Sequence, residues 1–240
     1  MDIDYRVSEK IASDGFAIVE DVFSPGEIKQ LLADITVAET SAPTFRKTNE
    51  LFAIRQFLKE VPGTTNLIFN PTLTSLIVQL FGNGYFVVKS IYFDKPGASN
   101  WFVAYHQDLT ISVDQKRDIG GYGPWTTKHN QFAVQPPIDI LEDNFTIRIH
   151  LDDTNEQNGA LKVIPGSHLK GIYRPETIDW SQEREQICTV KKGGIMIMKP
   201  LLLHASGRTT NNLQRRVIHI EFSNRTLAAE LQWSEKSYTV

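Results

Sequence analysis

The sequence predicts an α+β fold in which N-terminal helices flank a jelly-roll, cupin-like β-barrel. Residues 1–83 carry apolar residues at helical spacing, whereas from Tyr85 onward the apolar segments are short, rich in β-branched and aromatic residues, and separated by turn residues. Helices that precede strands, instead of alternating with them, are typical of α+β folds. We therefore expect one domain over residues 1–240, with a helical region over residues 1–83, a barrel over residues 84–225 and a short C-terminal tail.

The N-terminal segment is expected to form a helix, a strand and a second helix. Residues 7–14 have the pattern of a short helix, and residues 15–20 that of a strand. Ser24-Pro25-Gly26-Glu27 has the form of a capping box, with Ser at the N-cap, Pro at the first helical position and Glu at the third. An amphipathic helix over residues 25–38 follows from the apolar residues Ile28, Leu31, Leu32 and Ile35.

Two more helices are expected before the barrel. Leu51–Val61 is a helical candidate that ends at Pro62-Gly63. The next helix begins at Asn70-Pro71 and runs to Leu80-Phe81, with Gly82 as its C-cap. These helices would cover one side of the barrel.

The barrel region contains eight expected strands and one long connection. The strands are residues 85–95, 102–107, 146–152, 160–165, 187–191, 194–199, 201–205 and 215–223. Residues 114–145 include Gly120-Gly121-Tyr122-Gly123-Pro124-Trp125 and Pro136-Pro137, which indicates a loop. A loop of this length in a compact domain often acts as a lid over a site.

Composition excludes several classes of function. The formal net charge of -3, with no basic block, gives no basis for binding nucleic acid or an anionic membrane. No apolar run reaches the length of a membrane span, and the polar N-terminus is unlike a signal peptide. Cys188 is the only cysteine, so an intramolecular disulfide is impossible and a cytoplasmic location is the simplest expectation. The oligomeric state is not indicated.

Two histidines and one aspartate form the main candidate site. His106-Gln107-Asp108 would place an imidazole and a carboxylate on one face of a strand, because side chains alternate with period two. His204 would complete a set of two histidines and one carboxylate, which is typical of non-heme Fe(II) oxygenases. Arg215 follows, and a guanidinium pairs bidentately with a carboxylate. The pattern thus indicates iron, oxygen and a dicarboxylate co-substrate.

These motifs, with others between them, resemble the phytanoyl-CoA dioxygenase family. The resemblance covers roughly residues 10–225, and the order and spacing of the whole set are specific where a single His-x-Asp is not. The motifs are His106-Gln107-Asp108, Leu151-Asp152-Asp153 leading into Asn158-Gly159-Ala160-Leu161, Ile164-Pro165-Gly166-Ser167-His168, His204-Ala205-Ser206-Gly207, and Arg215.

The resemblance implies a double-stranded β-helix that uses Fe(II), 2-oxoglutarate and O2. It implies that His106, Asp108 and His204 hold the iron, that Arg215 binds the distal carboxylate of 2-oxoglutarate, and that Ser206 assists it. The retained Asp108 favours an oxygenase, because halogenating relatives have a small residue in its place.

Three further residues are weaker candidates. Arg148 matches a position that points into the active site of relatives, where it could meet an anionic substrate group or the co-substrate; an exposed strand arginine is the alternative. Lys89 could supply a second positive charge for 2-oxoglutarate. Trp125, together with Trp101 and Tyr122, could form a substrate wall, although loop packing explains the latter two as well. No metal role is expected for the histidines His129, His150 and His168.

The sequence therefore predicts an Fe(II)- and 2-oxoglutarate-dependent dioxygenase. We expect it to hydroxylate a small secondary or amino-acid-like metabolite, as in natural-product biosynthesis, although desaturation, cyclisation and other oxidative outcomes use the same ligands. One alternative is a non-catalytic ligand-binding jelly roll. Another is a cupin-type metalloenzyme without 2-oxoglutarate, which would have no need of Arg215.

Overall fold

The computed structural model describes residues 3–38, 44–48, 52–128, 131–228 and 230–240. Its helices and antiparallel sheets agree with the predicted α+β class. A large sheet, called the major sheet below, has the strand order β1-β12-β9-β14-β4-β3-β2, and β15 (Ser237–Thr239) also pairs with β4. In that order the strands are Phe16–Val19, Ile195–Met198, Phe145–His150, Arg215–Ser223, Phe86–Lys95, Phe52–Arg55 and Phe45–Lys47.

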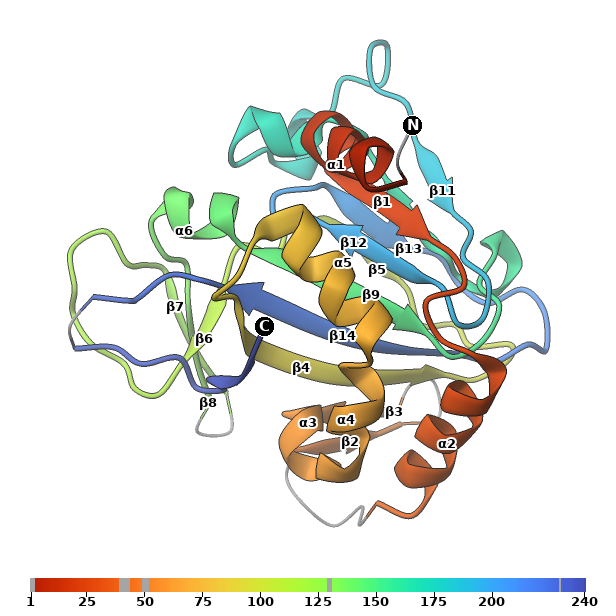
Figure 1. The fold of residues 1–240 in the computed structure, drawn as a ribbon. Helices are drawn as coiled ribbons and strands as arrows, with labels where there is room; N and C mark the ends of the chain where they lie inside the picture. The colour runs from red at the N-terminus through yellow and green to blue at the C-terminus, as the bar shows by residue number, and fades with distance from the viewer. Residues whose placement is uncertain (1–2, 39–43, 49–51, 129–130, 229) are drawn as a thin grey trace.

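Two smaller sheets complete the β-structure. The minor sheet has the order β11-β10-β13-β5, with the strands Gln186–Cys188, Leu161–Val163, His204–Ser206 and Val103–His106. A three-stranded sheet has the order β6-β8-β7, with the strands Ile111–Val113, Gln131–Val134 and Trp125–Lys128. Strands of the minor sheet lie behind the major sheet in Figure 1, on the side away from α5.

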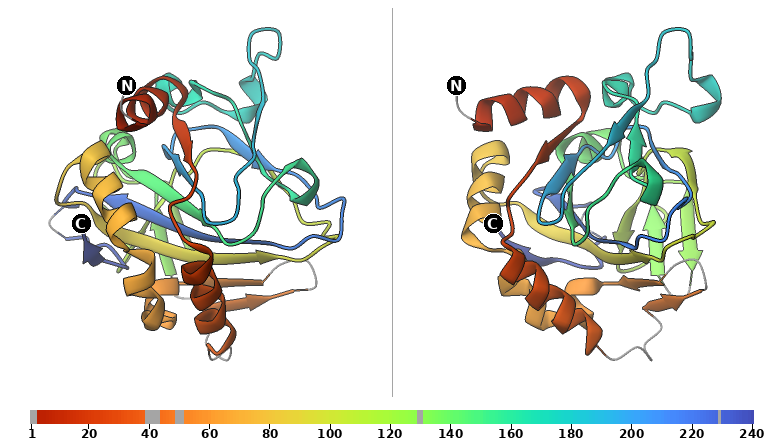
Figure 2. Two further views of the ribbon diagram at one scale, coloured as in Figure 1. Left: turned by 45° about the vertical axis from the view of Figure 1, so that its right-hand side comes forward. Right: turned by 90° about the vertical axis from the view of Figure 1, so that its right-hand side faces the viewer.

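The helices α1 to α5 pack on the other side of the major sheet, as Figure 2 shows for α2 and α5, whereas α6 packs with Phe86 and Val88 on the opposite face of β4. The α-helices in the described residues are α1 Ile3–Asp14, α2 Pro25–Thr36, α3 Phe57–Glu60, α4 Thr65–Ile68, α5 Pro71–Phe81 and α6 Ile138–Asp143. Short 3-10 turns occur at Pro62–Thr64, Glu156–Asn158, Ser167–Lys170 and Pro175–Thr177. In this described portion of the chain, none of the helices has the length and apolar character needed to cross a bilayer.

Local sequence determines where the two longest predicted helices begin and end. Ser24 caps α2, and its backbone N–H and Oγ–H both donate to the Glu27 carboxylate, so the predicted capping box is present. Asn70 caps α5 through the Leu73 N–H, and Gly82 follows its last residue with φ of 85°. Both helices turn apolar residues toward the sheet, because their buried positions recur every three or four residues.

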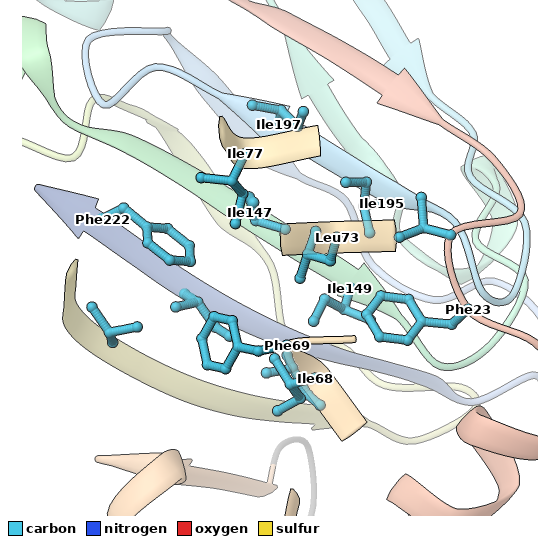
Figure 3. Packing of buried hydrophobic residues seen from close by; sticks show 14 of the residues in the cluster. Phe23, Ile68, Phe69, Leu73, Ile77, Ile147, Ile149, Ile195, Ile197 and Phe222 are labelled. Carbon is cyan, nitrogen blue, oxygen red and sulfur yellow. The ribbon is translucent and has the colours of Figure 1, made fainter. Parts of the chain in front are cut away.

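The main core lies between α5 and the major sheet. Leu73 and Ile77 of α5 face Ile147, Ile195 and Phe222 of the sheet (Figure 3). On β14, residues Ile218, Ile220 and Phe222 point into this core, because alternate side chains of a strand point to opposite faces. Arg215, His219 and Glu221 therefore point to the other face, toward the minor sheet.

The predicted helix Leu51–Val61 is wrong. Leu51 lies outside the described residues, and Phe52–Arg55 forms the strand β3, which pairs with β4 from Phe52↔Asp94 to Arg55↔Ile91. Gln56 then adopts a left-handed conformation (φ 51°), which separates the strand from the short helix α3. Pairing with the long edge of β4 outweighs the local helical pattern, and the N-terminal helical region contains β2 and β3 as well as β1.

The predicted loop 114–145 also differs from the structure. It contains β7, β8 and α6, and only residues 129 and 130 within it lie outside the described residues. β8 pairs with β6 and β7, so this segment contributes two strands to a small sheet. The β-branched residues Thr126 and Thr127 lie in β7, and the glycines and prolines that suggested a loop lie at the ends of these elements.

Candidate active site between the two sheets

His106, Asp108 and His204 meet on the minor sheet. β5 and β13 pair so that His106 lies directly opposite His204. Asp108 lies just beyond the end of β5, where its N–H donates to the Pro200 carbonyl. The Asp108 carboxylate oxygens lie 3.9 Å from His106 Nε2 and 3.8 Å from His204 Nε2. One ligand atom from each of the three residues lies within 4.8 Å of the others.

Hydrogen bonds orient both imidazoles toward this centre. His106 Nδ1 lies 2.9 Å from the Ala104 carbonyl, and His204 Nδ1 lies 2.9 Å from the Leu202 carbonyl. A carbonyl accepts only from a protonated nitrogen, so each Nδ1 carries the hydrogen and each Nε2 presents its lone pair to the centre. This arrangement is common for histidines that bind metals.

The protonation states also suit a cation. Burial lowers the pKa of His204 to about 4, with Asp108 partly opposing the shift, so this imidazole is neutral near pH 7. Burial raises the pKa of the Asp108 carboxyl, but the electrostatic influence of the nearby His204, His219 and Lys89 outweighs burial and leaves this pKa well below the usual range. An ionised carboxylate and a neutral imidazole are the forms that bind metal ions.

Arg215 and Ser206 supply the hydrogen-bond donors of the site. Arg215 is 3% exposed, and its Nε and one terminal nitrogen have no hydrogen-bond partner among the described residues. The Ser206 hydroxyl is likewise buried and without a partner in the described portion of the chain. Arg216 points to the opposite face, where it pairs with Asp152 at 2.6 Å. Arg215 thus points into the cavity between the two sheets, and Arg216 points away from it.

Arg148 and Lys89 line the same cavity but belong to a connected polar chain. Arg148 donates to His219 Nδ1 at 3.0 Å, which leaves the hydrogen on Nε2 of His219, and Nε2 lies 3.1 Å from the Glu221 carboxylate. Lys89 forms an ion pair with Glu221 at 2.8 Å. Burial lowers the pKa of Arg148 to about 10, so it is still charged at neutral pH.

The cavity between the two sheets has a volume of about 170 Å³. Its wall combines residues of both sheets: Lys89, Ile91 and Phe93 from β4, Arg148 from β9, Arg215, His219 and Glu221 from β14, Val103 and His106 from β5, and His204, Ala205 and Ser206 from β13. Asp108, Leu161 and Trp101 complete it. The structure therefore brings together all the sequence-predicted site residues except Trp125 and Tyr122.

Trp125 lies elsewhere, in β7, where it packs against the apolar cluster that contains Phe86 and Trp233. Tyr122 packs against the same cluster. Trp101 lines the cavity, as a substrate wall requires, with Lys95 Nζ 5.7 Å from its ring centre. Glu221 was not singled out from sequence, although it shares the face of Arg215 at period two.

The other histidines have separate roles. His150 Nδ1 bonds to the Thr154 hydroxyl, and burial lowers the pKa of His150 well below its ordinary value. His168 Nε2 bonds to the Ala12 carbonyl. His129 lies outside the described residues. His219 and Glu221 could form a second set with Asp108, but both are already engaged with each other and with Arg148 or Lys89.

Sequence comparison then decides the family. The model of the phytanoyl-CoA dioxygenase family (PhyH) matches residues 11–217. The chain belongs to this family. It is a 2-oxoglutarate-dependent non-heme iron dioxygenase, as the ordered motifs predicted. The match includes His106, Asp108, His204 and Arg215.

Similar proteins include several 2-oxoglutarate-dependent enzymes. A probable alpha-ketoglutarate-dependent hypophosphite dioxygenase of Stutzerimonas stutzeri is 24% identical over 87% of this chain and 74% of its own length. An ectoine dioxygenase of Bordetella bronchiseptica is 25% identical over 66% of this chain and 47% of its own length.

Solved structures confirm the jelly-roll fold. EctD from S. alaskensis, in its apo form, has a TM-score of 0.71 at 20% identity and covers 92% of this chain and 78% of its own. The alpha-ketoglutarate-dependent epimerase SnoN from nogalamycin biosynthesis has a TM-score of 0.67 at 17% identity, with 93% and 84% covered.

The residues of the cavity fit iron and 2-oxoglutarate. Buried polar atoms are almost always hydrogen-bonded. In the described residues, however, buried polar atoms of Arg215, Ser206 and Asp108 have no hydrogen-bond partner. The first two offer donors to a carboxylate, and the third offers an acceptor to a cation. The donor set of two imidazoles and one carboxylate suits Fe(II).

Proposed function

We propose that this chain oxidises a C–H bond of a small metabolite, with iron held by His106, Asp108 and His204. When bound, iron would supply the oxidising power together with 2-oxoglutarate and O2, and succinate and CO2 would be the co-products. His106, Asp108 and His204 would hold the metal, and the cavity that they line would admit the co-substrate beside it. Hydroxylation is the outcome we propose.

Arg215 and Ser206 bind 2-oxoglutarate in this proposal. The two unpaired nitrogens of Arg215 would donate to the distal carboxylate, and the Ser206 hydroxyl would donate a further hydrogen bond. Arg148 and Lys89 would keep the potential of the cavity positive and attract anionic groups, and the polar chain through His219 and Glu221 fixes their positions. The surrounding Ile91, Phe93 and Leu161 exclude water from the reacting centre.

The single observation that carries the proposal is the buried Arg215 guanidinium, which has two nitrogens without hydrogen-bond partners in the described residues and lines the same cavity as the histidines and Asp108. A cupin-type enzyme without 2-oxoglutarate would have no reason to bury an unpaired guanidinium there, because the desolvation is unfavourable. A non-catalytic jelly roll would have no reason to retain three oriented metal ligands. A cytoplasmic setting belongs to the proposal and rests on the single, buried Cys188.

Anaerobic dialysis against Fe(II) tests the metal assignment. We expect the wild-type protein to retain about one equivalent of iron, and Asp108→Ala and His204→Ala to lose it while keeping the circular dichroism of the folded chain. His168→Gln is the matched control, because this histidine is outside the cavity. Iron retained by both alanine variants would remove these residues from the metal site.

A further inference from the structure

We propose that the substrate of this enzyme carries an anionic group at the end remote from the oxidised carbon, and that Arg55 binds this group. The inference rests on the proposed function, because it takes the oxidised carbon to lie beside His106, Asp108 and His204. It adds a binding site outside the metal cavity and a chemical class of substrate: an elongated small molecule with a carboxylate, phosphate or sulfate.

The register of the major sheet places Arg55 in one row with the active-site residues. Arg148 on β9 pairs with His219 on β14, His219 pairs with Ile91 on β4, and Ile91 pairs with Arg55 on β3. Side chains of directly paired residues lie on the same face. Neighbouring strands are about 4.8 Å apart, so Arg55 lies about 10 Å from His219 along the face that lines the metal cavity.

A second cavity extends along this row. It has a volume of about 460 Å³ and shares Lys89 and Ile91 with the metal cavity as a common wall. The metal cavity, with a volume of about 170 Å³, is the smaller of the two, and in the proposed function iron and 2-oxoglutarate would both occupy it. The body of a substrate therefore needs further space, and the second cavity is adjacent to the site.

Arg55 differs from the other charged side chains that line the second cavity. Lys89 pairs with Glu221, Glu235 accepts hydrogen bonds from the N–H and hydroxyl of Ser90, and Asp114 accepts from the backbone N–H of Gln232. Arg55 is half-buried, and its guanidinium has no hydrogen bond or ion pair with the described residues. It is therefore the one charged side chain of this lining, within the described portion of the chain, that has no protein partner.

The surroundings of Arg55 favour an anion. Thr44 lies opposite Arg55, whose N–H donates to the Thr44 carbonyl, and the Thr44 hydroxyl is buried without a hydrogen-bond partner in the described residues. Arg46 in β2 is two residues beyond Thr44 and lies on the same face. Burial, together with the charge of Arg46, lowers the pKa of Arg55. Two guanidinium groups and a free hydroxyl can donate to a carboxylate or phosphate together.

The other residues that line the second cavity indicate the chemical character of the rest of the substrate. Ile91, Val113, Phe132 and Trp233 supply an apolar surface, and Thr110, Ser112 and Thr126 supply hydroxyl groups. Gln56, which also lines the cavity, has φ of 51°, a conformation that is rare for residues other than glycine and that occurs often at binding sites. The lining suits a mainly apolar molecule about 10 Å long with a charged end.

Binding of chemically matched probes tests this inference. The probes are hexanoate, octanoate and decanoate, each compared with its primary carboxamide, which has the same shape without the charge. Binding to the protein loaded with iron and 2-oxoglutarate is measured anaerobically by calorimetry. We expect a carboxylate to bind at least about tenfold more tightly than its amide, which corresponds to about 1.4 kcal/mol.

The variant Arg55→Gln should remove this preference while leaving amide binding unchanged. Arg6→Gln, on an exposed face of α1, is the matched control and should keep the preference. Equal binding of acids and amides to the wild-type protein, no binding of any acid, or an unchanged preference in Arg55→Gln would overturn the inference. Iron and 2-oxoglutarate binding, followed in the same samples, separates this failure from a failure of the proposed function.

Discussion

Replacing Arg215 with methionine separates binding of 2-oxoglutarate from stability of the fold. Arg215 is 3% exposed, and its Nε and one terminal nitrogen have no hydrogen-bond partner in the described residues. Each charge-assisted hydrogen bond to a ligand contributes about 1.5 kcal/mol or more, so the loss of two should weaken 2-oxoglutarate binding by about 3 kcal/mol, or more than 100-fold. Iron binding should not change, because Arg215 is not among the proposed ligands.

The same substitution should not lower the stability of the ligand-free protein. An unpaired buried guanidinium carries a desolvation penalty of about 1–3 kcal/mol, and methionine has a similar shape without that penalty. Arg215→Met should therefore keep or raise the free energy of unfolding of the ligand-free protein, measured by urea denaturation. Loss of affinity without loss of stability distinguishes a ligand-binding arginine from a structural one.

The neighbouring Arg216 is the control for both measurements. It lies on the opposite face and pairs with Asp152, both side chains being partly exposed. Arg216→Met should lower the free energy of unfolding by at most about 1 kcal/mol and leave 2-oxoglutarate affinity unchanged. The reasoning would be refuted if Arg215→Met bound 2-oxoglutarate as tightly as the wild type, or if Arg216→Met lost affinity to the same degree.

Three further predictions concern stability. Phe145 is fully buried and stacks on Phe81 and Phe222, so Phe145→Ala should lower the free energy of unfolding in urea by about 3–5 kcal/mol, and Phe145→Leu by less. Gly159 has φ of 81° and a Cβ there would lie 2.8 Å from the Gly207 carbonyl, so Gly159→Ala should lower the melting temperature, whereas Gly63→Ala, with open space, should not. Burial raises the pKa of Glu235 from 4.5 to about 6, so the protonated carboxyl adds about 2 kcal/mol to the free energy of unfolding. This contribution is complete below pH 4.5 and is lost as the pH rises through 6. Glu235→Gln should remove this pH dependence of unfolding, and an unchanged profile would contradict the prediction.

Local signals explain why most elements could be predicted from the sequence. The capping residues Ser24 and Asn70 define the starts of α2 and α5 through hydrogen bonds within four residues. On β14, period-two alternation separates the apolar core residues from Arg215 and its neighbours. The inward orientation of Arg215 and the outward orientation of Arg216 follow from that alternation together with the family resemblance.

The errors occurred where distant residues decide the structure. Phe52–Arg55 forms a strand because β4 offers an edge, a partner about forty residues away that local periodicity does not reveal. Trp125 pairs within the three-stranded sheet, and only the fold shows that Trp101 faces the cavity instead. Arg55 had no recognisable motif at all, because its place beside the site depends on the register of four strands.

The measurement that tests the central claim most directly is an anaerobic titration with Fe(II) and then 2-oxoglutarate. The account predicts a weak visible charge-transfer band when 2-oxoglutarate is added to the iron-loaded wild-type protein, and no band with Arg215→Met at the same concentration. A folded, iron-loaded wild-type protein without the band would contradict the assignment of 2-oxoglutarate, and a folded protein that binds no iron would contradict the assignment of His106, Asp108 and His204.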